Sequence, residues 1–416
     1  MSTAYIVGGG LAGLAAAVAL AEKGRKVVLF EGAPQAGGRC RSYFDATLGC
    51  VIDNGNHLVL SGNTSVQSYL KVIGAQDGLA GPDRAVFDFA DVRTDRRWTL
   101  RPNDSALAWW IFSEDRRVPG TQPQDYLALV RLLAAGATDR IEDVIDCSGP
   151  LWERLLHPFL LAVLNSEPRT ASAKLAGAVI SESLARGGLA YRPRIAHPTL
   201  ASAFVDPALK YLAAHGADVR IGQRVRAVAM DDWRVTGLDL AGTPVAVGKD
   251  DRVILAVPPW VATELLPGLT APTEFRSIVN AHFKVVPPAG APRITGVIGG
   301  AAEWVFAFED RVSITVSGAD AIVDDDREAL ARRFWADVAK VLHLSGDLPP
   351  WQVVKERRAT FAATPEQAAR RPGTQTRWPN LLLAGDWTAT GLPATIEGAI
   401  RSGQKAAGLA LRLPSP

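Results

Sequence analysis

The chain has 416 residues, of which 48% are apolar and 21% charged, a composition typical of globular proteins with material for two or three domains. It excludes a disordered, fibrous or disulfide-stapled chain. Lysine and arginine number 45 against 43 acidic residues, and the resulting net charge of +2 is too small for the positive field that nucleic-acid binding requires. No nucleic acid is therefore expected as a partner.

Cysteine usage and the N-terminal stretch both favour an intracellular protein. Cys40, Cys50 and Cys147 are odd in number and lack metal-ligand spacing, so neither a disulfide framework nor a metal site is expected. The uncharged stretch Met1–Ala21 has no basic n-region and contains three consecutive glycines, which argues against a signal peptide. We expect a cytoplasmic location.

The chain opens with the pattern strand, glycine turn, helix, strand and acid. The segments are the apolar run Ala4–Val7, the turn Gly8–Gly13, the Ala- and Leu-rich Leu14–Lys23, and the apolar run Lys26–Phe30 that leads to Glu31. This βαβ unit with a G-x-G-x-x-G turn predicts a dinucleotide site. A glycine turn that serves packing alone is the alternative.

Each residue of this turn has a physical task. Gly8 allows the tight turn, Gly10 lets the backbone approach a pyrophosphate, and Gly13 lets the helix pack closely on the strand. Leu11 and Ala12 complete the motif before the helix, whose N-terminus would hold the phosphate charge.

The acid and a second glycine motif narrow the nucleotide. Glu31 would accept hydrogen bonds from adenosine ribose hydroxyls and would repel a 2′-phosphate. After it come Gly37, Gly38 and Arg39, where the glycines allow close backbone approach and Arg39 is able to pair with a phosphate. The βαβ unit by itself does not distinguish NAD from FAD, and a solvated arginine in a glycine-rich loop is the alternative.

These motifs resemble those of the FAD-dependent family that includes amine oxidases, phytoene desaturases and protoporphyrinogen oxidase. Further matching segments lie in the middle and at the C-terminal end of the chain: Val253–Pro259, Leu383–Asp386 and Glu397–Ala399. The resemblance implies an α/β fold in which a Rossmann-type FAD-binding domain is interleaved with an α+β substrate domain.

The same resemblance implies roles for individual residues. Glu31 would hold the adenosine ribose, Arg39 would lie near the pyrophosphate, and Val225 would meet the adenine through its backbone. Gly385 and Asp386 would bind the ribityl or pyrophosphate region.

The C-terminal residues independently predict an anion site. Asn380–Ala384 is a buried-strand run that ends at Gly385, and a final helix opens at Thr395 and Ile396 after Pro393. A strand end that faces a helix N-terminus suits an anion or a polarised carbonyl. In the family this helix start faces the flavin, and a purely structural cap is the alternative.

A narrower resemblance lies in the segments Asp53–Asn63, Gly385–Thr388 and Gly391–Glu397. They look like the squalene-associated flavoproteins of hopanoid biosynthesis, the hydroxysqualene dehydroxylases. This resemblance implies FAD-dependent reductive removal of the hydroxyl from hydroxysqualene to give squalene, with an apolar isoprenoid as substrate.

The matching regions divide the chain into interleaved segments. Residues 1–75, 206–265 and 377–416 are expected to form the FAD-binding domain, and residues 76–205 and 266–376 the substrate domain.

Within the substrate segments, Trp109–Phe112 and Leu151–Leu164 are strongly apolar. They would line a long apolar tunnel, touch a bilayer surface or form core helices. Val305–Phe308 and Val312–Val316 predict strands of a cavity wall, and Arg327–Leu342 predicts an amphipathic helix.

Removal of an allylic hydroxyl requires a proton for the departing oxygen, stabilisation of an allylic cation and a hydride from reduced flavin. By position in the motif, Asp53 and His57 are the candidate catalytic residues. His57 suits a general acid if its pKa stays near the working pH. A histidine bonded to backbone and an aspartate that forms a turn or orients another group are the alternatives.

The remaining motifs leave the electron donor unidentified. Gly296–Gly300 lacks the spacing of a second dinucleotide motif, so no nicotinamide site is expected. No cysteine follows Cys147, which argues against a C-terminal cysteinyl link, and the FAD is therefore expected to be noncovalent.

Two other functions stay open at this point. One is a carotenoid-type desaturase acting on a polyene, and the other is a non-catalytic isoprenoid-binding protein similar to GDP-dissociation inhibitors. An amine oxidase is disfavoured because no aromatic pair framing an amine is recognisable. Because an apolar C30 substrate partitions into lipid, peripheral contact with the inner face of the cell membrane is expected.

Overall fold

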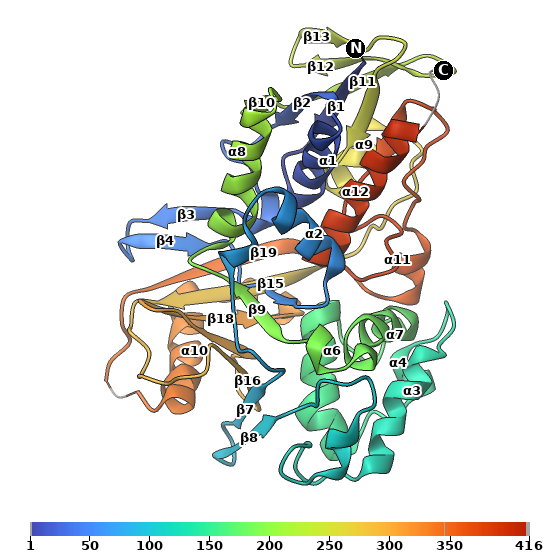
Figure 1. Ribbon diagram of the computed structural model, residues 1–416. Helices are drawn as coiled ribbons and strands as arrows, with labels where there is room; N and C mark the ends of the chain where they lie inside the picture. Colours follow the sequence, from blue (N-terminus) through green and yellow to red (C-terminus); the bar gives the residue numbers. More distant parts are fainter. Residues whose placement is uncertain (1, 345, 413–416) are drawn as a thin grey trace.

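The computed structural model describes residues 2–344 and 346–412. Its upper part in Figure 1 is a five-stranded parallel sheet with the strand order β10-β2-β1-β14-β20. The strands β2, β1, β14 and β20 are short, mainly apolar and largely buried, as parallel sheets require, whereas the edge strand β10 is partly exposed. Their bounds are β10 Asp218–Ile221, β2 Lys26–Glu31, β1 Thr3–Val7, β14 Arg252–Leu255 and β20 Leu381–Leu383.

Helices α1 (Leu11–Glu22) and α12 (Ile396–Arg412) pack side by side against this sheet. Their contact is backbone-close, because a Cβ atom at Gly403 would lie 2.1 Å from the Ala12 carbonyl oxygen. The first and last segments of the chain therefore share one layer, and the expected strand-turn-helix-strand unit is confirmed.

All three segments assigned to the FAD-binding domain contribute strands to the parallel sheet. The chain from Ala196 to Val205 also packs into the core of this sheet, together with α8 (Asp206–Ala214). The core thus takes in residues ahead of the expected boundary at residue 206.

The second sheet has seven strands in the order β19-β15-β18-β17-β16-β7-β8 and is antiparallel except between β16 and β7. Figure 1 shows it below the parallel sheet, with the long strands β19 and β15 between them. The bounds are β19 Trp351–Phe361, β15 Phe275–Phe283, β18 Val312–Val316, β17 Trp304–Ala307, β16 Ile294–Ile298, β7 Phe87–Asp91 and β8 Arg96–Leu100.

Helix α10 (Arg327–Leu342) covers one face of this sheet and shares a core with it. It begins where the Asp326 side chain accepts a hydrogen bond from Ala329 N, a standard N-cap. The predicted helix and both predicted strands of this region are confirmed, and the opposite face of the sheet stays available for a cavity.

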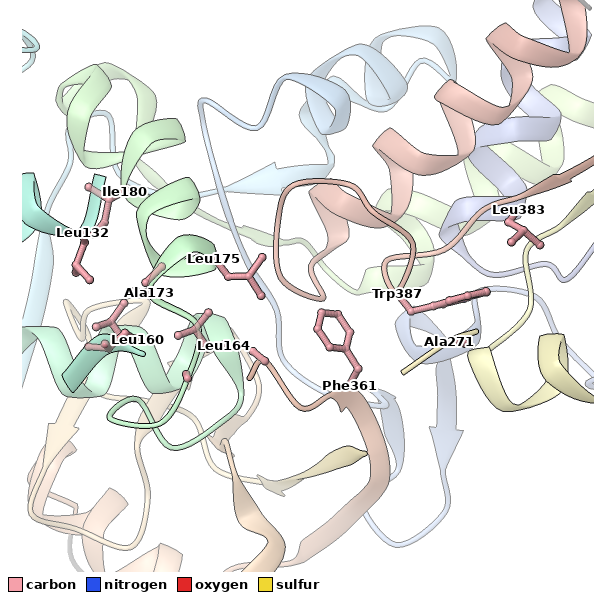
Figure 2. Close-up of a cluster of buried hydrophobic side chains, with 14 of the residues drawn as sticks. Leu132, Leu160, Leu164, Ala173, Leu175, Ile180, Ala271, Phe361, Leu383 and Trp387 are labelled. Carbon is pink, nitrogen blue, oxygen red and sulfur yellow. The ribbon is translucent and has the colours of Figure 1, made fainter. Parts of the chain in front are cut away.

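The third part is helical and lies at the end of the molecule away from both termini (Figure 1). The expected apolar segment at 151–164 is helical, with a π-helical turn at Trp152–Leu156. The helices of this third part are α3 Leu127–Leu133, α4 Ile141–Val144, α5 Gly149–Leu151, α6 His157–Leu164 and α7 Ala173–Glu182. Figure 2 shows buried side chains of α3, α6 and α7 in one cluster with Phe361 and Trp387, so the helical part is packed continuously onto the rest.

Shorter elements complete the fold. The remaining strands are β3 Ser42–Asp45, β4 Cys50–Asp53, β5 Leu58–Leu60, β6 Leu79–Ala80, β9 Pro193–Ala196, β11 Ala227–Met230, β12 Val235–Leu240 and β13 Thr243–Ala246. The remaining helices are α2 Thr64–Val72, α9 Pro259–Leu265 and α11 Pro365–Ala369. Across the described residues, none of the helices combines the length and apolar character needed to cross a bilayer.

Candidate active site

A cavity of about 1220 Å³ runs from the ends of the parallel strands to the helical part. Pockets for single small ligands usually measure roughly 300 to 1,000 Å³, so this one has room for a second molecule. One end is lined by glycine-rich loops, the middle by polar groups of the second sheet, and the far end by aromatic and aliphatic side chains.

The first glycine loop is shaped by backbone contacts. Gly8 has φ +108°, and a Cβ atom there would lie 2.5 Å from the Ala256 carbonyl oxygen. A Cβ atom at Gly13 would lie 1.9 Å from the Gly8 oxygen, whereas one at Gly10 would meet no protein atom within 4 Å. Protein packing therefore explains the glycines at 8 and 13 but not at 10, where the backbone borders the cavity. This open cradle fits a pyrophosphate, with Leu11 and Ala12 at the helix start beside it.

Glu31 stands at the end of β2 with one carboxylate oxygen 2.6 Å from Gly9 N and the other 2.7 Å from Ala33 N. Both bonds hold the carboxylate at the edge of the cavity, where Val225 also lies. Val225 follows β10, the strand next to β2. The structure thus brings the two residues expected at the adenosine end to one place, although 194 positions separate them in the sequence.

The second glycine loop lies directly against the first. Gly37 has φ +105° and donates its N–H to Gly9 O at 2.8 Å, and Gly38 also has a positive φ. Both of these residues border the cavity. Two glycine loops in contact give a backbone-lined groove that suits the diphosphate of a dinucleotide.

Arg39 borders the cavity but has two partners in the protein. Its guanidinium donates to both oxygens of Asp386, at 2.8 and 2.7 Å, and to the Ala359 carbonyl. The Asp386 side chain is 7% exposed and that of Arg39 42%. One guanidinium nitrogen bonds both oxygens of Asp386 while another bonds Ala359. These charge-assisted bonds hold both side chains in place, so Arg39 acts first as the clamp on the Gly385–Asp386 turn.

The start of α12 faces the same cavity. The Thr395 hydroxyl accepts a hydrogen bond from Gly398 N at 3.0 Å, and Thr395 and Ile396 both line the cavity. The structural cap, which was the alternative interpretation of this segment, is thus present, and the helix start also borders the cavity. Glu397 also borders the cavity, and its carboxylate accepts the N–H groups of Ser65 and Val66 at 3.0 and 2.9 Å.

Asp53 does not border the main cavity. It is 3% exposed, and one carboxylate oxygen accepts the Ser42 hydroxyl at 2.5 Å and Leu200 N at 2.9 Å. Burial raises its pKa, and these hydrogen bonds oppose that shift. The Asp53 side chain thus joins β3 to the segment before α8. This arrangement fits the alternative that Asp53 orients other groups better than it fits a catalytic role.

His57 does border the main cavity. It also lines a second cavity of about 10 Å³ together with Asp53 and Asn56, so Asp53 stands behind it. Burial lowers the pKa of His57 to about 4, Arg39 lowers it further, and Asp386 opposes the shift. The condition set for a general acid, a pKa near neutral pH, is therefore not met by His57 in this structure.

A polar patch between the second sheet and the loop after β4 was not expected from the sequence. Asn280 accepts the Thr315 hydroxyl at 2.7 Å, Asn56 donates to Thr315 at 3.2 Å, and Asn54 donates to Glu356 at 3.3 Å. All five residues line the cavity. Asn54 and Asn56 lie in the motif segment 53–63, but Asn280 and Thr315 stand alone on two separate strands and carry no motif. Only the tertiary structure brings them together.

The far end of the cavity is apolar. Phe89 stacks on Trp98 with ring centroids 5.4 Å apart and meets Trp304 edge-on at 6.0 Å. Phe89 and Trp304 line the cavity together with further aromatic and aliphatic side chains: Phe87, Leu100, Trp110, Leu129, Leu155, Leu156, Phe159, Val163, Tyr191, Ile294 and Phe306. Such a chamber suits a long hydrocarbon.

Comparison with known proteins agrees with this geometry. Residues 11–411 match the family described as flavin containing amine oxidoreductase. The chain is 53% identical over 410 residues to the hydroxysqualene dehydroxylase of Rhodopseudomonas palustris, with 98% of each chain covered. It is 51% identical over 407 residues to that of Sinorhizobium fredii, again with 98% of each covered.

Solved structures resemble the whole chain at lower identity. Cyclohexylamine oxidase from Brevibacterium oxydans superposes with a TM-score of 0.73 and 15% identity, with 99% of each chain covered. An oxidoreductase from Methanosarcina mazei superposes with a TM-score of 0.70 and 13% identity, over 98% of this chain and all of the other. At these identities the likeness concerns the fold.

Proposed function

This chain belongs to the family of flavin-containing amine oxidoreductases, and from that premise we propose that it catalyses the FAD-dependent reductive dehydroxylation of hydroxysqualene to squalene. The support is twofold. Relatives named hydroxysqualene dehydroxylase share about half of its residues over nearly the full length, and the cavity joins a dinucleotide groove to an apolar chamber. The chamber is the observation that carries the substrate class, because its far end is lined by aromatic and aliphatic side chains that suit a long hydrocarbon.

The residues that would hold FAD noncovalently are those of the groove. Glu31 and Val225 would take the adenosine, Gly10, Gly37 and the start of α1 the pyrophosphate.

At the other end of the groove, Gly385, Asp386, Thr395 and Ile396 would border the flavin. When bound and reduced, FAD supplies the hydride that replaces the hydroxyl. Cys40 borders the cavity, and burial raises the pKa of its thiol to about 12, which disfavours the thiolate needed for a covalent link.

The rest of the reaction depends on side chains of this chain. The carbon–oxygen bond breaks, the oxygen leaves as water after taking up one proton, and the vacant carbon takes the hydride. The aromatic faces of Phe89 and Trp304 would stabilise positive charge on the allylic carbons. The polar patch at Asn56, Asn280 and Thr315 would bind the single hydroxyl and fix which end of the hydrocarbon reacts.

His57 would lie against the reacting groups in its neutral form. With a pKa of about 4, only about one imidazole in a thousand carries the extra proton at pH 7. In this proposal it orients the hydroxyl as a hydrogen-bond partner. The electrons come from an external donor, since the sequence has no second dinucleotide motif.

The experiment is an anaerobic incubation of the purified protein with chemically reduced FAD and hydroxysqualene, followed by identification of the C30 products. Squalene that forms only with reduced flavin is the expected result. Unchanged alcohol from a yellow, flavin-loaded protein would contradict the proposal and favour a desaturase, which dehydrogenation of a polyene with an electron acceptor then tests. Unchanged alcohol from a colourless protein would favour an isoprenoid-binding protein.

Peripheral contact with a membrane is the second part of the proposal. Trp109 and Phe112 are both 62% exposed and their rings lie 6.2 Å apart. Leu127 and Val130 of α3 are 57% and 59% exposed. Trp110 lies between the first pair and lines the cavity. The elements that enclose the apolar chamber therefore present apolar side chains outward, where they would enter the lipid that holds the substrate.

Sedimentation with phospholipid vesicles tests this contact. The double substitution Trp109→Ser and Phe112→Ser is expected to lower the vesicle-bound fraction at least about tenfold, because two large apolar side chains lose their transfer energy. A matched control is Phe44→Ser with Trp233→Ser, a pair 66% and 79% exposed on other elements. Equal losses for both variants, or no binding of the unaltered protein, would contradict the membrane contact.

A further inference from the structure

The source of the proton is the one chemical requirement that the residues named so far leave unassigned. Among the ionisable groups that border the cavity beyond the cofactor loops, Glu182 is paired with Arg401 at 2.5 Å and Glu356 is bonded to Asn54. Glu264 of α9 is exposed, and burial raises the pKa of Tyr191, which weakens its hydroxyl as an acid. His57 is neutral near pH 7.

The carboxyl group of Glu303 lies close to the chamber without lining it, one position before the wall residue Trp304 in the sequence. Glu303 directly precedes β17, whose Trp304 and Phe306 line the cavity. Its Oε2 accepts the backbone N–H of Ser317 at 2.8 Å, and the Ser317 hydroxyl is its second polar partner. Ser317 is 5% exposed and borders the cavity directly after β18. The contact between Glu303 and the chamber therefore runs through Ser317.

This serine lies at the edge of the polar patch. Thr315 of the patch is two residues before it, near the end of β18, and both residues line the cavity. Trp304 pairs with Thr315 on the neighbouring strand. A hydroxyl held by the patch, with its hydrocarbon among the aromatic rings, would thus lie beside Ser317.

The charged groups on the elements around Glu303 are engaged elsewhere. Asp320 accepts Ser277 N at 2.8 Å and lies 3.5 Å from Arg276. Two further charged groups are bonded locally: Asp337 of α10 accepts the N–H groups of Ala301 and Ala302, and Arg93 pairs with Asp91.

Without an opposing charge, burial raises the pKa of Glu303 to about 7, and the hydrogen bonds from Ser317 only moderate the shift. A carboxylic acid of that strength is protonated in a large fraction of molecules at neutral pH and gives up its proton readily. Protein atoms surround the carboxyl group closely, but the residue keeps some solvent exposure, so solvent is able to replace the proton after each turnover.

We propose that Ser317 is the catalytic residue that protonates the departing hydroxyl and that Glu303 supplies the proton through it. The Ser317 O–H proton passes to the substrate oxygen while the Glu303 proton passes to the Ser317 oxygen. The carbon–oxygen bond then breaks with its electron pair on oxygen, so water leaves and Glu303 remains as carboxylate. The inference rests on the proposed dehydroxylation, whose reductant is reduced FAD.

The test compares Glu303→Gln with Asp337→Asn. Both are amide replacements of a carboxylate that accepts backbone N–H groups, but Glu303 bonds Ser317, which lines the cavity, whereas Asp337 bonds Ala301 and Ala302, which do not. Glu303→Gln is expected to lower kcat at least about 100-fold with KM changed less than about threefold, and Asp337→Asn to leave both near the original values. Activity of the unaltered protein should fall as pH rises through about 7, and this limb should vanish in Glu303→Gln.

A second measurement does not depend on turnover. The infrared carbonyl band of a protonated carboxylic acid should disappear between pH 6 and pH 8 in the unaltered protein and in Asp337→Asn, and should be absent from Glu303→Gln. Ser317→Ala should keep the band and lose kcat as Glu303→Gln does. Because charging Glu303 costs folding energy above pH 7, the Gln variant should be at least as stable there.

The outcomes separate the two proposals. If the unaltered protein converts hydroxysqualene and Glu303→Gln retains kcat and the pH limb, the proton path is wrong while the dehydroxylation stands. If no band titrates near pH 7, the path is wrong whatever the activity. If the band titrates as expected but the unaltered protein forms no squalene, the dehydroxylation itself fails.

Discussion

The cofactor end of the cavity is shaped by backbone, whereas the substrate end is shaped by side chains. At the first end, two glycine loops touch each other and a Cβ atom at Gly13 would overlap the Gly8 oxygen. At the second end, rings such as Phe89 and Trp304 from separate strands define the wall. A single methyl group is a large change at the first end and a small one at the second.

The difference teaches where specificity resides in this molecule. Backbone groups offer the same donors and acceptors in any sequence, so the groove is suited to a cofactor shared across a family. Side chains set the volume and polarity of the chamber, so substrate choice depends on residues that vary independently of the groove. The substitutions below test that division, starting with the largest expected effect.

Gly13→Ala and Gly10→Ala should separate folding from cofactor binding. In Gly13→Ala the methyl would lie 1.9 Å from a backbone oxygen and should cost roughly 3 kcal/mol, the upper range for overpacking. Gly10 has φ −73° and open space around its Cβ position, so Gly10→Ala should unfold like the original protein but bind FAD at least about tenfold more weakly. Urea unfolding measures the stability of each variant, and flavin titration measures its affinity for FAD. Equal losses of stability in Gly13→Ala and Gly10→Ala would contradict the separation of folding from cofactor binding.

His57 lies at the border between the two ends and should make stability depend on pH. Its pKa is about 4 in the folded protein against about 6.5 in an unfolded chain. Between these values the unfolded chain binds more protons, so this contribution is complete above pH 6.5 and is lost as pH falls toward 4. The loss should be on the order of 3 kcal/mol and absent from His57→Gln. Parallel pH profiles of unfolding free energy for both proteins would contradict the assignment.

Arg39→Gln should reveal the clamp on the cofactor-end turn. It leaves the Asp386 carboxylate, 7% exposed, without its bidentate partner. The expected cost is about 1 to 2 kcal/mol, less than for a fully buried pair because Arg39 is 42% exposed. A double-mutant cycle with Asp386→Asn measures the coupling. The exposed pair Arg332 and Glu328 is the control, and coupling no larger than its value would dismiss the clamp.

Phe89→Leu should change the substrate end with the least effect on the fold. The volume-reducing exchange should cost about 1 kcal/mol, leave FAD affinity unchanged and raise KM for hydroxysqualene several-fold. Phe283→Leu is the matched control, because Phe283 is fully buried on the opposite face of the same sheet against Trp335. If both variants raise KM equally, the chamber does not set substrate binding.

The fold could be predicted from sequence wherever local pattern decides it. The opening unit, the helix at 327–342 and the strands at 304–307 and 312–316 carry their periodicity and caps in a few consecutive residues. The candidate cofactor residues were found for the same reason, since turns and glycines act locally. Asp53 shows the limit, because a carboxylate in a family motif proved to hold Ser42 and Leu200 rather than to face the cavity.

The sequence by itself predicted a dinucleotide groove, because glycine turns and apolar runs obey rules that span a few residues. The interleaved second domain and the apolar substrate came from the resemblance of its motifs to a flavoprotein family. The tertiary structure alone decided which polar groups meet in the cavity. Asn56, Asn280 and Thr315 come together, and Glu303 reaches Ser317, because sheet pairing joins distant strands. The protonation of Glu303 follows from burial, and burial is a property of the whole fold.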